Sequence, residues 1–220
     1  MKFEAILFDC DGVLVDSEPL TNQVLREMLA EAGWSMTQAE CMAYFVGKTV
    51  REERAEIEAR TGQPLTQDWL NSFYQRRNQA LVARLEVIPG ARSAVQAAHD
   101  VTRGRIACAS GADRFKVEMQ LGKVDLLGFF AGRIFSGHEM PRSKPAPDVY
   151  LAAAAHLNLP GEQCLVIEDT TVGVTAGVAA GATVWAYSPQ PSGDAALLQA
   201  GARQLFRSMA DVPGLLLASP

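Results

Sequence analysis

The sequence predicts an α/β protein with a doubly wound, Rossmann-like parallel sheet and an inserted α-helical cap domain. Short apolar runs without polar alternation recur along the chain, which is typical of strands buried on both faces of a parallel sheet. Helical patterns lie between these runs, as in proteins that alternate strand and helix. The segment 16–86 departs from this rhythm and shows only helical patterns.

The sheet is predicted from five apolar runs, at 3–8, 105–109, 133–136, 164–167 and 182–187. The helices of the same domain are predicted at 91–100, 115–121, 148–157 and 172–180. In the last helical pattern, Gly173 and Gly177 are followed by Gly181 at the same spacing. This repeat places small residues on one helical face and favours close packing of that helix on the sheet.

Four helices are predicted in the inserted segment, at 19–32, 38–45, 51–60 and 67–85. Thr37 and Glu40 are spaced as a capping box before the second of them. The chain is therefore predicted to fold as a core domain of residues 1–15 and 87–220 and a cap domain of residues 16–86. A helical module that follows a strand can act as a lid, because open α/β sheets bind ligands at the carboxyl ends of their strands.

The composition is that of an ordinary globular protein, with 220 residues, 48% of them hydrophobic and 20% charged. The net charge of −5 and the lack of a basic run argue against a nucleic-acid-binding surface. The four cysteines form no CxxC motif, so we expect buried, reduced thiols in a cytoplasmic protein. No secretory signal is recognisable. We expect a monomer or weak dimer with neither nucleic acid nor a membrane as its partner.

Two pairs of acidic residues follow predicted strands. Asp9 and Asp11 follow the first strand, where residues i and i+2 share a face and can point into one site. Glu168 and Asp169 follow the fourth. Taken alone, the first pair suits a turn and the second a helix N-cap. Four carboxylates at one sheet edge would repel each other unless a divalent cation lay among them, and Mg²⁺ prefers oxygen ligands.

A hydroxyl and an ammonium group complete the candidate site. Ser110 and Gly111 follow the second predicted strand, where they can donate to a phosphate, although a helix cap is the alternative. Lys144 lies between Ser143 and a proline, in a rigid loop. A compact ammonium there can neutralise a phosphoryl oxygen and a nucleophile; the alternative is a solvated surface lysine. Surface charges without an assigned role are expected at Arg114, Lys116 and Lys123.

Together these pieces resemble the haloacid dehalogenase (HAD) superfamily. The matching segments are DCDGVLVDSE (9–18), CASG (108–111), SKPAPD (143–148) and IEDTTVG (167–173). Within the superfamily the chain is similar to the β-phosphoglucomutase-like branch, and most similar to its sugar-phosphate phosphatases, including bacterial 6-phosphogluconate phosphatases. The resemblance implies a HAD-like core with a helical cap and a Mg²⁺-dependent phosphoric monoester hydrolase that acts on a small phosphorylated metabolite.

The resemblance also implies roles for the site residues. Asp9 would attack phosphorus and form an aspartyl-phosphate, while Asp11 would protonate the leaving alcohol and then activate water. Mg²⁺ would be held by the Asp9 carboxylate, the Asp11 backbone carbonyl and Asp169, with Glu168 close by. The phosphoryl oxygens would be bound by the side chains of Ser110 and Lys144 and by backbone amides near Asp11, Gly12 and Gly111.

Positions in the predicted cap bear on the choice of substrate. The mutases of this branch carry a histidine where this chain has Thr21, which favours a phosphatase. A phosphomutase, or a catalytically silent binding protein on the same fold, is the alternative. Lys48 and Arg51 interrupt the helical pattern in a region that faces the active site in related proteins, so they are candidates for substrate binding. The alternative for both is a solvated charge at a helix end.

Overall fold

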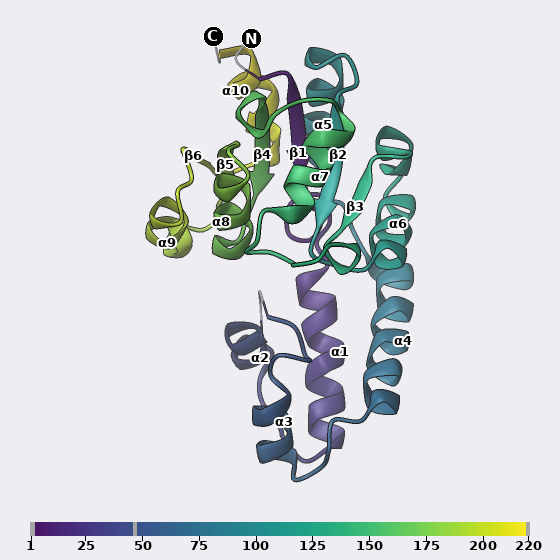
Figure 1. Cartoon of the computed structure of the whole chain (residues 1–220). Helices are drawn as coiled ribbons and strands as arrows, with labels where there is room; N and C mark the ends of the chain where they lie inside the picture. Colours follow the sequence, from purple (N-terminus) through teal and green to yellow (C-terminus); the bar gives the residue numbers. More distant parts are fainter. Residues whose placement is uncertain (1–2, 46–47, 219–220) are drawn as a thin grey trace. The chain divides into compact units, whose positions relative to one another are not determined.

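The chain forms two compact units in its computed structural model, which describes residues 3–45 and 48–218. The core unit comprises Met1–Val15 and Val87–Pro220, and the cap unit comprises Asp16–Glu86. Figure 1 labels the helices and strands of each unit.

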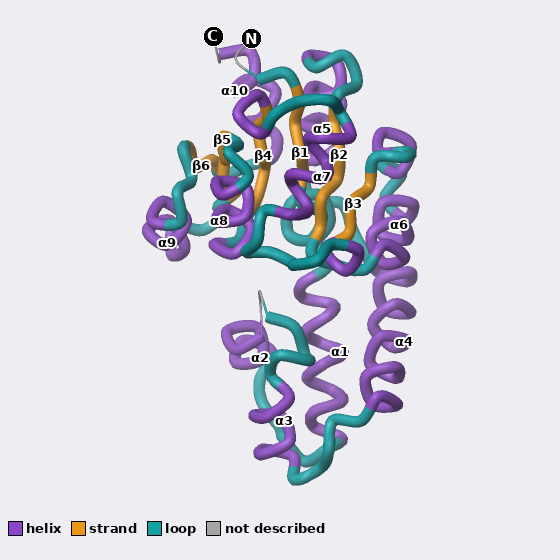
Figure 2. The backbone as a smooth tube through the Cα atoms, viewed as in Figure 1, coloured by secondary structure: helices purple, strands orange, loops and turns teal. Residues whose placement is uncertain are grey.

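A six-stranded parallel sheet, in the order β3-β2-β1-β4-β5-β6, organises the core unit (Figure 2). The strands are β1 (Ala5–Phe8), β2 (Ile106–Ser110), β3 (Ile134–Ser136), β4 (Cys164–Glu168), β5 (Thr183–Tyr187) and β6 (Gln204–Phe206). Every residue of β1, β2 and β4 is buried, which explains why these runs are apolar without alternation. The predicted fold class is confirmed. Strand β6 was not predicted, because its three residues, which begin with Gln204 and are only partly buried, do not form an apolar run.

Helices pack against the sheet of the core unit. They are α5 (Ala91–Val101), α6 (Arg114–Lys123), α7 (Asp148–His156), α8 (Thr171–Ala179), α9 (Asp194–Gln199) and α10 (Val212–Ala218), of which the last two were not predicted. Residues of α7 and α8 share an apolar cluster with Leu7 of β1. Phe8 points to the opposite face, where its ring meets that of Phe130 edge-on with centroids 6.1 Å apart.

In the described part of the cap unit, residues 16–45 and 48–86, the structure has four helices, as predicted. They are α1 (Glu18–Glu31), α2 (Gln38–Phe45), α3 (Arg54–Thr61) and α4 (Gln67–Arg84), and they enclose one apolar cluster. The capping box before α2 is present, since the Glu40 N–H donates to Thr37 Oγ1 (3.2 Å) and the Thr37 N–H donates to Glu40 Oε2 (2.8 Å). Helix α3 begins three residues later than predicted, because residues 51–53 form a turn.

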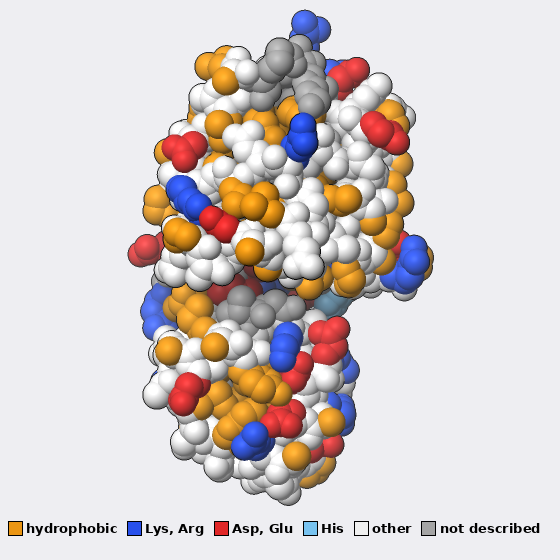
Figure 3. Space-filling model, turned by 90° about the vertical axis from the view of Figure 1, so that its left-hand side faces the viewer, with side chains coloured by type: hydrophobic (Ala, Val, Ile, Leu, Met, Phe, Trp, Pro, Cys, Tyr) orange, Lys and Arg blue, Asp and Glu red, His pale blue; other side chains and the backbone are white. Residues whose placement is uncertain are grey.

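The placement of the cysteines and of the charged side chains is that of an ordinary globular protein. All four cysteines are free and buried, as expected. Acidic and basic side chains are interspersed on the face that Figure 3 shows. Within residues 3–45 and 48–218, no helix has the length and apolar character needed to cross a membrane.

Candidate active site

The carboxyl ends of β1, β2 and β4 meet at one edge of the sheet, where these neighbouring strands run in parallel (Figure 1). The end of β1 is in register with Cys108 of β2 and Ile167 of β4. Asp9, Ser110 and Glu168 follow at this level and therefore reach the same edge. This is the place where open α/β sheets bind their ligands.

A tight loop follows β1 and brings the first acidic pair close to the second. The Asp9 N–H donates to the Ile167 carbonyl at 3.0 Å, which ties the start of the loop to β4. Gly12 has a φ of +77°, and a Cβ atom at this position would overlap the Asp169 carboxylate. Both its backbone conformation and this close approach require glycine.

Three carboxylates form a compact acidic cluster. Asp9, Glu168 and Asp169 each offer an oxygen atom, and these atoms lie within 4.8 Å of one another. Asp9 and Glu168 are buried, and Asp169 is half-buried. A group of hard oxygen ligands at this spacing fits a divalent cation such as Mg²⁺.

Lys144 is a buried partner of this cluster. Its Nζ lies 2.6 Å from Asp9 Oδ1 and 2.8 Å from Glu168 Oε1, and the side chain is 7% exposed. The structure thus rules out the alternative of a solvated surface lysine. One ammonium group is shared between two buried carboxylates.

Tyr150 and the start of α8 fix the Glu168 side chain. The Tyr150 hydroxyl lies 2.9 Å from Lys144 Nζ and donates to Glu168 Oε1 at 3.0 Å. Glu168 Oε2 accepts hydrogen bonds from the backbone N–H of Asp169 (2.9 Å) and of Thr170 (3.1 Å). Sequence reasoning did not identify Tyr150, because an aromatic residue in an apolar helical pattern indicates only a core position.

Burial and charge act against each other in this cluster. Burial raises the pKa of Asp9 to about 7 despite the nearby Lys144 ammonium, and the Glu168 carboxylate adds to the rise. Burial acts to lower the pKa of Lys144, but the carboxylates of Asp9 and Glu168 outweigh it and hold this pKa well above its ordinary value. Burial acts to raise the pKa of Glu168, but Lys144 and backbone N–H groups outweigh it and hold this pKa below its ordinary value. The cluster therefore contains more carboxyl groups than the single Lys144 ammonium can neutralise.

The Asp11 carboxylate is held by Lys116, which was expected to be a surface charge, and by Gln120. Lys116 Nζ lies 2.9 Å from both Asp11 carboxylate oxygens, and Gln120 Nε2 donates to Asp11 Oδ1 at 2.8 Å. The expectation that Lys116 is a surface charge is wrong, since its side chain is only 9% exposed. The available signal was its helical spacing, because Lys116 shares the buried face of α6 with Val117 and Leu121.

Ser110 and Gly111 lie at the end of β2. Ser110 is buried, and its Oγ accepts a hydrogen bond from the Ala112 N–H at 3.1 Å. The hydroxyl therefore faces the backbone turn that leads into α6. Its role in binding a phosphoryl group stays a prediction, as does that of Gly111.

The two predicted substrate-binding residues of the cap have partners inside the cap unit. Lys48 Nζ lies 3.2 Å from Glu53 Oε1 and 4.3 Å from the centroid of the Tyr44 ring. The Arg51 guanidinium donates to Gln67 Oε1 at 3.1 Å. Both charged residues are exposed, and their part in substrate binding stays a prediction.

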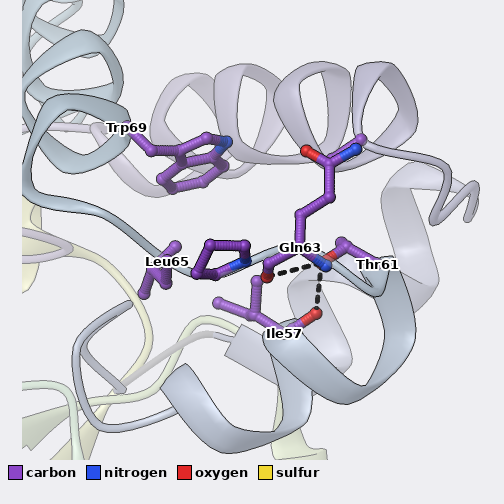
Figure 4. Close-up of a pocket in the computed structure, with 7 residues that line it drawn as sticks. Ile57, Thr61, Gln63, Leu65 and Trp69 are labelled. Carbon is purple, nitrogen blue, oxygen red and sulfur yellow. Dashed lines mark hydrogen bonds between the residues drawn. The ribbon is translucent and has the colours of Figure 1, made fainter.

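A small hollow in the cap unit differs in character from the acidic site (Figure 4). It is lined by Ala32, Ile57, Thr61, Gln63, Pro64, Leu65 and Trp69. The Thr61 hydroxyl donates to the Ile57 carbonyl at 2.8 Å. This lining holds no titratable group, whereas three carboxylates gather in the acidic cluster of the core unit.

The sequence also matches a known protein family. The family model described as haloacid dehalogenase-like hydrolase matches residues 3–181. The chain belongs to this family. The match spans the loop after β1, the cap unit, Lys144 and the acidic pair after β4, so the hydrolase superfamily predicted from the motifs is confirmed.

Known members of the family resemble the chain over most of its length. The 6-phosphogluconate phosphatase of Escherichia coli (strain K12) is 29% identical over 191 residues, which cover 86% of this chain and 85% of that protein. A HAD family hydrolase of Deinococcus radiodurans R1, solved with bound phosphate and sodium, is 32% identical with a TM-score of 0.80, covering 99% of this chain and 96% of that one. A Thermotoga maritima protein provisionally named a β-phosphoglucomutase is 25% identical with a TM-score of 0.83, covering 99% and 100%.

Proposed function

We propose that this chain is a Mg²⁺-dependent phosphatase that hydrolyses a small phosphorylated metabolite through an aspartyl-phosphate intermediate. The observation that carries the proposal is the Asp9 carboxylate, which is buried beside the Lys144 ammonium in a cluster of acids. A nucleophilic carboxylate splits hydrolysis into two easier steps. The similarity to a 6-phosphogluconate phosphatase supports a sugar phosphate or a sugar-acid phosphate as the substrate.

The metal site of the proposal uses the donors already described. Asp9 and Asp169 of the acidic cluster would hold Mg²⁺, with Glu168 close by. The resemblance to the family adds the Asp11 backbone carbonyl as a third ligand. When bound, the ion supplies positive charge that neutralises the phosphoryl oxygens and the nucleophile.

The first step forms the covalent intermediate. A carboxylate oxygen of Asp9 attacks phosphorus, and the bond between phosphorus and the ester oxygen breaks. Asp11 transfers a proton to the leaving oxygen, so that an alcohol departs. Lys144 and Ser110 bind phosphoryl oxygens and hold the group in line for attack.

The second step restores the enzyme. Asp11, now a carboxylate, takes a proton from a water molecule, and the water oxygen attacks phosphorus. The bond between phosphorus and Asp9 breaks, which releases inorganic phosphate. Asp11 retains the proton for the next cycle, so protons balance over both steps.

A phosphate-release screen tests this function. Sugar phosphates, sugar-acid phosphates and nucleotides are incubated with the protein and Mg²⁺, and then with a chelator. We expect turnover of at least one sugar or sugar-acid phosphate, lost on chelation and in Asp9→Asn, while the melting temperature shows that the variant is folded. Turnover by Asp9→Asn at the wild-type rate would contradict the mechanism.

A phosphomutase is the second candidate, because the Thermotoga maritima neighbour carries that provisional name. Thr21, which stands where the mutases of the branch have a histidine, argues against it. Incubation with β-glucose 1-phosphate and a bisphosphate primer separates the two functions. Free phosphate is expected, whereas isomerised hexose phosphate without free phosphate would favour the mutase.

A further inference from the structure

Two side chains of α6 hold the Asp11 carboxylate from one direction. Lys116 and Gln120 are four residues apart and therefore lie on one face of the helix. Lys116 donates to both carboxylate oxygens at 2.9 Å, and Gln120 donates to Oδ1 at 2.8 Å. The Lys116 and Asp11 side chains are only 9% and 17% exposed, so water screens this pair weakly. The carboxylate is thereby restrained against rotation.

The orientation of the Gln120 amide is itself fixed. Gln120 is fully buried, and its Oε1 accepts a hydrogen bond from the Cys10 thiol at 3.7 Å. Since the amide oxygen faces Cys10, the amide nitrogen faces Asp11. Cys10 lies between the two acids of the first pair, so the loop after β1 and helix α6 are joined by two adjacent contacts.

The first turn of α6 is anchored independently of Asp11. Asp113 caps the helix, its Oδ1 accepting from the Lys116 N–H at 2.9 Å. The Arg114 guanidinium donates to both carboxylate oxygens of Glu139, at 2.6 Å each. The helix that presents the two donors is thus also held by contacts that do not involve Asp11, and a functional group supported by residues on a helix is kept within a narrow range of orientations.

We propose that Lys116 and Gln120 are positioning residues that orient Asp11 for proton transfer to the leaving oxygen and from the attacking water. The proposal rests on the proposed function, because it assigns these two residues to the acid and base of that reaction. A group that transfers a proton must lie within hydrogen-bond reach of its target, so loss of orientation slows the steps that need the proton.

Leaving groups of different basicity test the proposal. The value of kcat/KM covers only the steps up to departure of the leaving group, which in this mechanism forms the aspartyl-phosphate. Nitrophenolate is stable as an anion and leaves p-nitrophenyl phosphate without a proton, whereas an alcohol needs one. Lys116→Met is compared with the wild-type protein on p-nitrophenyl phosphate and on the alkyl phosphate that the wild type turns over fastest.

We expect Lys116→Met to lower kcat/KM for the alkyl phosphate about 10²-fold, the lower end of a general acid's contribution, and to change it little for p-nitrophenyl phosphate. Equal losses on both esters, or no loss, would overturn the proposal. Lys123→Met, an exposed lysine on the same helix, is the matched control and should leave both values unchanged. In an Asp11→Ala background Lys116→Met should cause no further loss, and a further loss would also overturn it.

Gln120→Leu keeps the proposal testable if Lys116→Met fails to fold, because it removes a hydrogen bond without leaving a buried charge unpaired. The same selective loss is expected, and an equal effect on both esters would contradict the proposal. If the wild-type protein hydrolyses neither ester, the proposed function itself fails. If it hydrolyses both and the variants show no selectivity, only the positioning role fails.

Discussion

At the scale of single residues, Lys144 connects the two buried carboxylates of the site. Its ammonium group contacts both Asp9 and Glu168 from a position that is 7% exposed. Removing one member of a buried ion pair leaves the other charge uncompensated, which costs far more than the loss of a surface pair. The same ammonium is positioned to neutralise a phosphoryl group that approaches Asp9.

Replacing Lys144 with methionine should therefore damage both stability and turnover. We expect a loss of about 3–5 kcal/mol in the free energy of unfolding, measured by urea denaturation. We expect kcat for phosphate release to fall about 10²–10³-fold, as when one donor to developing charge is removed. Lys123→Met serves as the exposed control. Wild-type turnover by a folded Lys144→Met protein would contradict the assigned role.

The raised pKa of Asp9 predicts a pH dependence of metal binding. In the metal-free protein this pKa is about 7, so the group is protonated below that pH and must lose its proton to coordinate an ion. Calorimetric titration with Mg²⁺ should show the affinity falling by about tenfold for each pH unit below about 7, and levelling off above it. An affinity independent of pH across this range would contradict the combination of a raised Asp9 pKa and metal coordination by Asp9.

At the scale of elements, α8 serves both the site and the sheet. Its N-terminus lies against the Glu168 side chain, and a Cβ atom at Gly173 would overlap that carboxylate. One turn later, a Cβ atom at Gly177 would lie 2.8 Å from Val184 Cγ2 and 3.2 Å from Val166 Cγ1. The glycines thus allow the helix to approach the sheet closely, which supports the packing role predicted from their spacing.

Gly177→Ala should destabilise the core unit without altering the acidic site. Overpacking of this kind costs about 1–3 kcal/mol, which exceeds the gain of up to about 1 kcal/mol from the better helix propensity of alanine. Urea denaturation measures the loss, and kcat at a temperature where both proteins are folded should be unchanged. Gly193→Ala, where no atom lies within 4 Å of the added Cβ, is the control. A more stable Gly177→Ala protein would refute the close approach.

At the scale of the whole molecule, the sequence predicted the architecture better than the partners of individual side chains. The fully buried strands β1, β2 and β4 are continuous apolar runs and were recognised as such. The strand β6 was not recognised because it begins with a polar residue and is only partly buried, so it lacks the apolar run that marked the other short strand, β3. Asp9, Lys144, Glu168 and Asp169, which the structure brings together, could be predicted because acids at strand ends and a lysine among prolines are local signals in the sequence.

The contacts of Asp11 had no comparable signal. Lys116 and Gln120 are separated from Asp11 by 105 and 109 positions in the chain. Only the parallel pairing of β1 with β2 brings the start of α6 beside the loop after β1. Spacing along α6 identifies a buried face, but it does not reveal which distant group a buried lysine neutralises.

Trapping the covalent intermediate tests the central claim most directly. The protein is mixed with substrate and Mg²⁺, quenched in acid, reduced with borohydride and digested with trypsin. Borohydride converts an acyl phosphate of aspartate to homoserine, so the account predicts homoserine at position 9 in the peptide from Phe3 to Arg26. Phosphate release with no modified residue, or modification at any residue other than Asp9, would contradict it.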